Sequence, residues 1–368
     1  MQESFSITPR VIAHLGEALI KNENIAILEL VKNSYDANAT VCEVFFEQDT
    51  SGKLTKIIIT DNGDGMTLSV IQKNWLVIGT DNKKIQLQKQ MKEEKRTSRL
   101  PLGEKGVGRL GVHKLGNQIS LISKTRKDKE VSLNINWKKL ETAKEIKDFP
   151  IELIENETPL FFTQDNHGTR IEISSLKTLW DRRKLRDVYR GLLSLNSPFS
   201  ETSEDFKIRI NSNSNFFAGL PTFEDIKESG MYFAHCSLSG TRINNFSYSF
   251  KPWTTLDKIK NGRVVNTKNL LEEDLRLKGI RFIETDDGKE KKEEYDINLD
   301  KHKVGTVDFD IIIFEPDTQI INLMNLEKTA FRSYMKSNGG IRVYRDDVRV
   351  YDYGEPDDDW EKLSIVVD

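Results

Sequence analysis

Three polar side chains near the start of the chain have the types and the spacing of a catalytic group. Within ILELVKNSYDANAT (27–40), Glu29, Asn33 and Asp36 fall within about 60° of one another when the stretch is wound as a helix at about 100° per residue. The other side is apolar or small and consists of Ile27, Leu30, Val31 and Ser34. The pattern predicts an amphipathic helix that presents a carboxylate, an amide and a second carboxylate in one row. A solvated helix face has the same composition, so the row alone does not assign a function.

A further acidic group follows an Ile-rich stretch. KIIITDNGDGM (56–66) predicts a buried strand that ends at Asp61, and Gly63 and Gly65 predict a sharp turn after it. A carboxylate at the end of a buried strand costs on the order of several kcal/mol unless a partner satisfies it. Considered alone, D-N-G-D-G is compatible with a hairpin turn or with an acidic calcium loop, and the turn is the simpler interpretation.

A glycine-rich stretch, GEKGVGRLG (103–111), contains the string G-x-G-x-x-G in Gly106, Gly108 and Gly111. A dinucleotide-binding turn needs a buried strand directly before the glycines, and the preceding stretch of about twenty residues is charged and irregular. A Walker loop needs Gly-Lys-Ser/Thr and a protein kinase needs an H-R-D loop, and the sequence contains neither. Successive backbone N–H groups of such a loop can nevertheless cradle a phosphate.

Together, and in this order, the stretches resemble the motifs of the GHKL ATPases, which include DNA gyrase, the heat-shock chaperone, histidine kinases, MutL and the MORC proteins. ELVKNSYDA resembles the N box, DNGDGM the first glycine box, GEKGVGRLG the second, and HGTRIEI (167–173) the later G-T box. The resemblance covers roughly residues 5 to 176. It implies an α/β (α+β) fold, a two-layer Bergerat-type sandwich with ATP as its ligand, whereas the spacing alone suggests only a nucleotide site.

The resemblance implies roles around the phosphates of ATP. Glu29 matches the general base that orients and deprotonates the attacking water, which contributes typically about 10²–10⁴-fold in rate. Asn33 matches the Mg²⁺ ligand, where one amide oxygen, phosphate oxygens and waters suit an ion that dehydrates reluctantly. Asp36 matches a family position near the nucleotide, in either a contacting or a supporting role.

The resemblance also implies a pocket for the base. Asp61 matches the carboxylate that accepts a hydrogen bond from the exocyclic amine of adenine. Such a charged bond is worth roughly 1.5–3 kcal/mol, which would favour ATP over GTP by one to two decades. Gly63 and Gly65 would let the backbone pass close to the base, and Met66 would supply an apolar wall. Thr169 is similar to the family threonine that supports the aspartate and adenine through a hydroxyl and a water.

The glycine-rich stretch resembles the hinge and phosphate wall of an ATP lid, which is expected over about 79–111. We expect the lid to be mobile without nucleotide and to become ordered over ATP. Its backbone N–H groups and the following helix N-terminus would face the phosphates, and Lys105 and Arg109 either add phosphate contacts or are solvated surface residues. The nucleotide-contacting residues expected here are Gly103, Lys105, Gly106, Val107, Gly108, Arg109, Leu110 and Gly111.

Hydrophobic periodicity and turn residues predict the elements that position these motifs. Helices are expected at 8–21, 23–38, 67–78, 179–195 and 326–336, with a short helix that runs from the glycine motif through Lys114. Strands are expected at 41–48, 56–60, 118–125, 129–137, 151–155, 169–176, 206–211, 231–238, 245–250 and 307–314, with a late pair in 341–351. The order predicts a mixed, mostly antiparallel ATP-binding domain over 1–176. A connecting helix and a smaller α/β transducer-like domain are expected over 177–368, with a loop or insertion in the charged stretch 257–303.

Two functional classes compete within the family. A histidine kinase places its phospho-accepting histidine and dimerisation helices before the ATP domain, and the 28 residues before Glu29 leave no room for them. The gyrase, MutL, MORC and chaperone branch adds a transducer domain, which residues 180 to 368 fit in length and order. We therefore predict a slow Mg²⁺-dependent ATPase that closes its lid and dimerises through its N-terminal part as a conformational switch. The alternative is a non-hydrolysing ATP sensor or a histidine-kinase-like ATP-binding module.

The lysine that this branch brings from the transducer domain to the terminal phosphate has no clear counterpart in the sequence. Lys328 and Lys336, in the expected helix 326–336, are candidates. The final residues, KLSIVVD, resemble an uncompleted strand, so we expect this chain to be the N-terminal portion of a longer protein.

Composition limits the location and the partners. A chain of 368 residues with a net charge of -3 and 37% hydrophobic residues indicates a globular protein whose surface is not built as a whole for nucleic acid. Cys42 and Cys236 are the two cysteines, and neither they nor the five histidines show the spacing of a disulfide framework or a zinc site. The start has no signal pattern and no run reaches transmembrane length. We expect a cytoplasmic, ATP-dependent homodimer that binds ATP and ADP and no membrane, with DNA or protein as its unassigned client.

Overall fold

The fold is described from a computed structural model. It describes residues 8, 11, 20, 22–77, 99, 101–102, 111–141, 143, 145–199, 206–227, 229–252, 262–284, 290–314 and 328–350. The chain forms two compact units. Unit 1 combines Met1–Ala218 with Gly339–Asp368, and unit 2 is Gly219–Asn338. Unit 2 is therefore inserted in the sequence of unit 1.

Unit 1 contains a seven-stranded sheet in the order β5-β4-β3-β6-β2-β1-β7. Neighbouring strands are antiparallel except β1 and β7, which pair in parallel. The strands are β1 Val41–Gln48, β2 Leu54–Asp61, β3 Gly116–Lys124, β4 Val131–Asn136, β5 Ile151–Glu155, β6 Gly168–Leu176 and β7 Lys207–Ser212. The expectation of a mixed, mostly antiparallel α/β sheet is confirmed.

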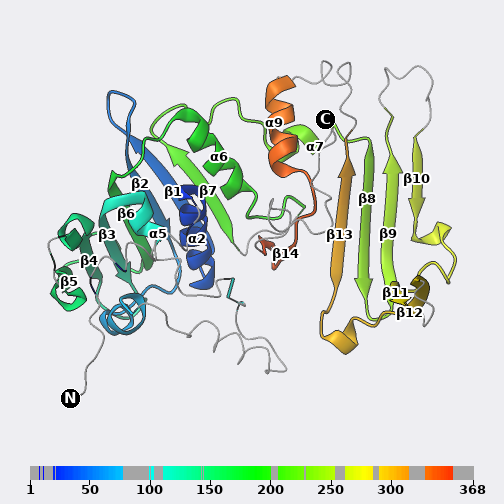
Figure 1. Cartoon of the computed structure of the whole chain (residues 1–368), viewed down its shortest axis with the longest axis horizontal. Helices are drawn as coiled ribbons and strands as arrows, with labels where there is room; N and C mark the ends of the chain where they lie inside the picture. Colours follow the sequence, from blue (N-terminus) through cyan, green and yellow to red (C-terminus); the bar gives the residue numbers. More distant parts are fainter. Residues whose placement is uncertain are drawn as a thin grey trace. The chain divides into compact units, whose positions relative to one another are not determined.

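Helices α2 (Glu23–Asp36), α5 (Gly111–Leu115) and α6 (Arg182–Leu193) pack with this sheet, and α2 and α6 lie side by side (Figure 1). The apolar side of α2 is buried against the sheet, as its periodicity predicts. A salt bridge of 3.0 Å between Lys184 and Glu23 also joins α6 to α2. Shorter elements of this unit are α3 Leu68–Val70, the π-helix η1 Ile71–Trp75, and the 3₁₀ turns η3 Trp137–Glu141 and η4 Ile146–Asp148.

Local sequence signals set both ends of α2. The Asn22 side chain caps the first turn by accepting from the Ile25 N–H at 2.9 Å. At the other end Asn38 adopts a left-handed conformation with φ 58°. The Asn38 N–H donates to the Tyr35 carbonyl and the Ala39 N–H to the Ser34 carbonyl, which is the Schellman arrangement that closes a helix. The chain therefore turns directly from the last polar residue of α2 into β1.

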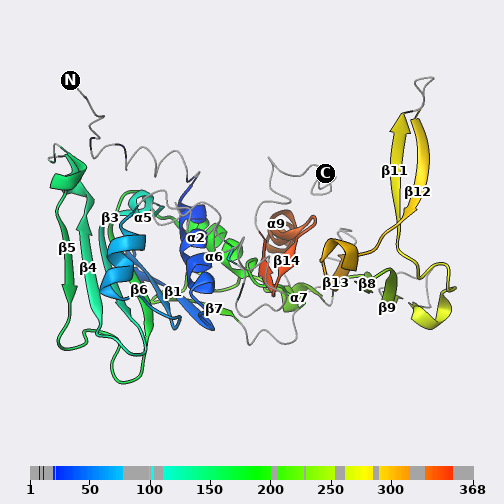
Figure 2. The same cartoon turned by 90° about the horizontal axis from the view of Figure 1, so that it is seen from below.

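Unit 2 contains a four-stranded sheet in the order β10-β9-β8-β13 and a separate β11–β12 hairpin that extends away from it (Figure 2). Ile226 of α7 and Phe331 of α9 form a small core of their own. The strands are β8 Tyr232–Ser239, β9 Arg242–Phe250, β10 Arg263–Asn266, β11 Lys278–Glu284, β12 Glu290–Asp296 and β13 Val307–Ile313. The helices are α7 Phe223–Lys227 and α9 Lys328–Asn338, and the 3₁₀ turns are η5 Thr267–Asn269 and η6 Asp300–His302.

The last described element is a tight hairpin, β14 (Tyr344–Arg345) and β15 (Val348–Arg349), which belongs to unit 1. Its two turn residues, Asp346 and Asp347, both have positive φ, as a two-residue turn of type I′ requires. The Arg349 N–H donates to the Leu195 carbonyl just after α6, and the Val348 side chain is 1% exposed in the main core.

The compact units do not divide at residue 176, where the sequence suggested a boundary. Strand β7, which we expected in the second domain, pairs with β1. The late hairpin β14–β15 pairs with Asn196, in the segment that follows α6. The charged stretch 257–303 contains three strands, β10, β11 and β12, where we expected a loop or insertion. The expected helix 8–21 and most of the expected lid lie outside the described residues.

Candidate functional site

Helix α2 carries the predicted row of polar side chains on one face, which is half-buried. Glu29, Asn33 and Asp36 are half-buried, while the side chains that face the sheet are buried: Ile27, Leu30, Val31 and Ser34. The structure therefore places the two carboxylates and the amide together at one helix face, as the spacing predicted. The Glu29 carboxylate also lies 3.3 Å from the ammonium of Lys32 on the same helix.

Asp61, at the end of β2, is the buried carboxylate of the site and is 8% exposed. One oxygen, Oδ1, accepts the Gly63 N–H at 2.9 Å and the Thr169 N–H at 3.1 Å. The other oxygen, Oδ2, accepts the Ser34 hydroxyl at 2.9 Å, which joins β2 to α2. Burial raises the pKa of Asp61, and these hydrogen bonds oppose that rise.

Cys42 lies beneath this group. It pairs with Asp61 across β1 and β2, and its thiol lies 3.5 Å from the Ser34 hydroxyl oxygen. Complete burial raises the pKa of Cys42 to about 12, so the group stays a neutral thiol at physiological pH. Cys42 is therefore a packing and hydrogen-bonding residue of the site.

The turn after Asp61 is held close to its neighbours by its glycines. Gly65 has φ 69°, and a Cβ there would collide with the carbonyl of Lys124. A Cβ on Gly63 would lie 2.5 Å from the Ala37 carbonyl oxygen, directly after α2. The two glycines thus allow the turn to approach both α2 and β3, which larger residues would prevent.

His167 fastens the same turn. Its Nδ1 lies 2.6 Å from the carbonyl oxygen of Gly63, and Arg126 donates from Nε to His167 Nε2 at 2.9 Å. Because Nε2 accepts and a carbonyl can only accept, these partners assign a neutral imidazole with its proton on Nδ1. The imidazole therefore donates to Gly63.

The Ser123 hydroxyl forms hydrogen bonds with both Met66 and Thr169. The Met66 N–H donates to the Ser123 hydroxyl oxygen at 2.8 Å, and the Ser123 and Thr169 hydroxyls lie 2.9 Å apart. Ser123 and Thr169 are cross-strand partners on β3 and β6. Thr169 thus supports Asp61 through its backbone N–H, whereas its hydroxyl, which we expected to act on Asp61, is paired with Ser123.

Two described residues that precede the glycine motif, Arg99 and Leu102, form hydrogen bonds with the end of α2 and the residues directly after it. The Leu102 N–H donates to Asp36 Oδ1 at 2.8 Å. Arg99 donates to the Ala39 carbonyl at 2.6 Å and lies over the Tyr35 ring at 4.8 Å. The following predicted phosphate residues, Gly103, Lys105, Gly106, Val107, Gly108, Arg109 and Leu110, lie outside the described residues.

Gly111 is the first described residue after the glycine motif and begins α5. A Cβ on Gly111 would lie 3.2 Å from the Ala26 Cβ, so the glycine lets α5 approach α2 closely. The described residues on either side of 103–110, Leu102 and Gly111, therefore both contact α2.

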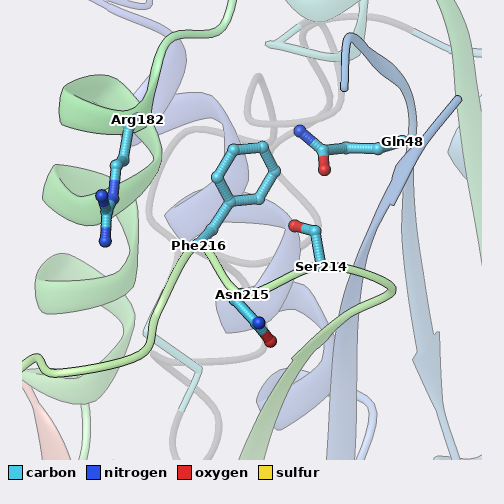
Figure 3. Close-up of a pocket in the computed structure, with 5 residues that line it drawn as sticks. All are labelled: Gln48, Arg182, Ser214, Asn215 and Phe216. Carbon is cyan, nitrogen blue, oxygen red and sulfur yellow. The ribbon is translucent and has the colours of Figure 1, made fainter. Parts of the chain in front are cut away.

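A separate cavity of about 300 Å³ opens at the other end of the sheet (Figure 3). The ring of Phe216 lies between Arg182 of α6 and Gln48 at the end of β1. Gln48 is six residues along β1 from Cys42, which is about 20 Å at about 3.3 Å per residue. This open cavity is therefore distinct from the group around Asp61.

Within the described residues, no group of three or more His, Cys, Asp and Glu side chains has the arrangement of a metal site. The donor set on α2 fits Mg²⁺ in a different way, because this ion commonly takes one or two protein oxygens and completes its shell with phosphate and water. Asn33 offers such an oxygen beside Glu29. The described helices also include none long and apolar enough to cross a lipid bilayer.

Comparisons with known proteins agree with this geometry. A family model described as histidine kinase-, DNA gyrase B-, and HSP90-like ATPase matches residues 21–169. This segment therefore matches the GHKL superfamily that the order of the motifs indicated. It includes α2, the Asp61 turn and Thr169, and domains of this family generally bind ATP.

A curated relative extends the comparison to another class of protein. A putative type II restriction enzyme, HgiDII of Herpetosiphon aurantiacus, is 32% identical over 117 residues. The match covers 31% of this chain and 16% of that protein. The chain thus matches about a sixth of the length of this relative.

Several residues of the GHKL site escaped the sequence argument. Ser34 was placed on the apolar side of the helix, which is where it bonds Asp61. Ser123 and Arg126 lie in and after β3, a strand without a recognised motif. His167 is the first residue of the G-T box, and it was assigned no role because the histidines show no metal-ligand spacing. A hydroxyl or imidazole that acts through hydrogen bonds leaves no periodic signal.

Proposed function

We propose that the protein binds ATP with Mg²⁺ at the GHKL site and hydrolyses it slowly, as a conformational switch. The observation that carries the proposal is the direct bond between Ser34 on α2 and Asp61 on β2. It ties the helix that bears Glu29 and Asn33 to the buried carboxylate suited to adenine. A nucleotide that spans the two would place its base at Asp61 and its phosphates along α2.

In the proposed reaction, the protein supplies a base, a metal ligand and an adenine acceptor. Glu29 orients the attacking water and takes its proton. Asn33 would hold Mg²⁺, which when bound neutralises charge on the phosphate oxygens. Asp61 accepts the adenine amine, and the turn through Gly63 and Gly65 borders the base.

The switch consists of lid closure and homodimerisation on ATP binding. A shift of a two-state equilibrium from mostly open to mostly closed needs about 5.5 kcal/mol of differential binding. A triphosphate held by a metal ion, a base pocket and a glycine loop can supply this amount. Whether Lys328 or Lys336, both on α9, reaches the terminal phosphate stays a prediction.

The proposal is tested by comparing the wild type with Glu29→Ala. We expect calorimetry to detect ATP binding with Mg²⁺ in both proteins, with dissociation constants within about threefold. Phosphate release should fall by about 10²-fold or more in the variant, because the water loses its base. An absence of binding heat in the wild type would contradict the assignment of the site.

The same experiment separates the alternative function. A wild type that binds ATP but releases no phosphate would be an ATP sensor or a histidine-kinase-like module. The half-buried carboxylate Glu29 favours hydrolysis, because many histidine kinases place an amide where this chain has a carboxylate.

DNA is a candidate client of the switch. It is favoured by the match with a protein named as a putative type II restriction enzyme. We expect duplex DNA to change the rate of phosphate release if DNA is the client. Unchanged rates over a range of DNA concentrations at low salt, where phosphate contacts are strongest, would contradict it.

A further inference from the structure

The ammonium of Lys32 is buried beside the carboxylate of Glu29. Nζ of Lys32 lies 3.3 Å from Oε1 of Glu29, and the two side chains are 3% and 24% exposed. Residues three apart on a helix are neighbours on its surface, so α2 itself holds the pair at this spacing. The adenine and metal roles described above do not involve Lys32.

Burial of this charge is costly for the fold. Taking an ammonium out of water costs on the order of several kcal/mol, and an apolar residue of similar volume often stabilises the site as well or better. Lysines usually extend their charge into water, as Lys129 does in its pair with Glu157, where the side chains are 50% and 84% exposed. Such an exposed pair contributes about 0–1 kcal/mol. A role in the chemistry of Glu29 therefore explains the buried charge of Lys32 better than a contribution to the stability of α2 does.

We infer that Lys32 is a positioning residue for Glu29, whose carboxylate it holds in the orientation that water activation requires. The inference rests on the proposed function. The ion pair with this buried partner restricts the rotation of the Glu29 side chain, so that its second oxygen has a defined direction.

The step that this pair serves is the attack of water on ATP. The water oxygen forms a bond to the terminal phosphorus while Glu29 takes a water proton. The bond from that phosphorus to the bridging oxygen breaks, and its electron pair leaves with ADP. Lys32 exchanges no proton in this step and holds the carboxylate in place before the proton arrives.

Other charged groups packed against α2 have different partners in the described residues. Lys114 of α5 and Lys184 of α6 both act on Glu23 in the first turn. Asp61 of β2 bonds Ser34. Lys32 is thus the described cation in ion-pair contact with Glu29.

The test compares Lys32→Met, Lys32→Arg and a control, Lys129→Met, which removes an exposed ion pair of the same unit. We expect Lys32→Met to bind ATP within about threefold of the wild type and to lower kcat by about tenfold or more. The value of KM should stay within about threefold of the wild type, because the nucleotide contacts remain and only the orientation of Glu29 is lost. Lys32→Arg should restore most of the rate, and Lys129→Met should match the wild type.

Two results would overturn the inference. One is a kcat for Lys32→Met within about twofold of the wild type. The other is a parallel loss of ATP affinity and kcat, which would indicate a phosphate contact or a role in folding.

A second readout separates this inference from the proposed function. If the wild type bound ATP but released no phosphate, the proposed hydrolysis would fail. The ion pair can still be tested without hydrolysis, by carbon NMR of labelled glutamate with the Glu29 signal assigned through Glu29→Gln. The carboxylate carbon signal of Glu29 should shift in Lys32→Met and not in Lys129→Met, and coincident signals in all three proteins would refute the pairing.

Discussion

At Asp61, three hydrogen bonds occupy three of the roughly four lone-pair positions of a carboxylate. Two of them are on Oδ1 and one is on Oδ2, so Oδ2 keeps one position for a further donor. Ser34 and the backbone of Gly63 and Thr169 hold the group rigidly. A rigid acceptor with one remaining position is suited to a single N–H donor such as the adenine amine.

We therefore predict that Asp61→Asn weakens ATP binding by about one to two decades, the equivalent of a charged hydrogen bond of roughly 1.5–3 kcal/mol. The asparagine oxygen would take the two backbone N–H groups and leave its amide facing the ligand. An amide donor repels the adenine amine and accommodates the guanine carbonyl, so the preference for ATP over GTP should shrink. Calorimetry with both nucleotides measures this, and an unaltered preference would show that the base is read elsewhere.

Glu130 is a second buried carboxylate, at the start of β4, and it organises the loop before the G-T box. It is 1% exposed and accepts the backbone N–H groups of Leu160, Phe161 and Phe162 and the amide of Asn156. Burial raises the pKa of Glu130, but these bonds outweigh burial and hold the pKa below its usual value. The ionised form thus stabilises a loop that leads directly to His167.

The stabilisation by Glu130 should depend on pH in a definite direction. Because the folded-state pKa is lowered, the contribution is complete above the unfolded value near 4.5 and is lost as the pH falls through the folded value. We predict that Glu130→Gln speeds amide hydrogen exchange at residues 160–162 at pH 7, by a loss of about 2 kcal/mol of local stability. The difference from the wild type should shrink at acidic pH, and a difference that grows there would contradict the assignment.

At the scale of elements, the β14–β15 hairpin, near the end of the described residues, contacts the segment that precedes the glycine motif. Arg345 donates to the Pro101 carbonyl at 3.2 Å. Val348 pairs with Asn196 and is buried in the main core. The neighbouring Leu102 N–H bonds Asp36 on α2. The hairpin thus helps to hold the segment that leads into the predicted phosphate wall.

We predict that Arg345→Met lowers the affinity for a non-hydrolysable ATP analogue by about fivefold, the equivalent of about 1 kcal/mol for one lost hydrogen bond. The amide of Leu102 should also exchange faster. Arg263→Met, an exposed change on β10 of unit 2, is the matched control. Equal affinities for the wild type and both variants would show that the hairpin does not influence the nucleotide site.

At the scale of the whole molecule, the insertion of unit 2 into unit 1 gives the chain two covalent connections between the units. One connection follows β7 and the other precedes the β14–β15 hairpin. The second connection leads directly into the hairpin, whose Arg345 bonds the Pro101 carbonyl.

The proposed switch predicts a change of assembly. Sedimentation or scattering should report a homodimer with Mg²⁺ and a non-hydrolysable ATP analogue, and a smaller species without nucleotide. Asp61→Asn should remain in the nucleotide-free state at concentrations that saturate the wild type. An identical mass with and without the analogue would contradict ATP-dependent dimerisation.

The local sequence was sufficient to predict the helix and the strand that bear the first two motifs. Helix α2 and strand β2 were predicted because their periodicity, the asparagine cap and the glycines are encoded within a few residues. Strand β7 was predicted as a strand of the second domain but pairs with β1, because its alternation does not specify its partner. The hairpin β11–β12 was missed, since its charged and exposed strand β12 lacks an apolar alternation.

The sequence by itself indicated the resemblance to the GHKL proteins, which a family model matches over residues 21–169, and the row of Glu29, Asn33 and Asp36, because motif order and helical spacing are local properties. Tertiary structure decided what surrounds them. Ser34, Thr169 and the Gly63 turn converge on Asp61 from three segments of the chain, and Arg345 reaches Pro101 from the far end of the sequence. The burial of Lys32 beside Glu29 is also decided by packing, because exposure depends on what covers a helix and not on the residues within it.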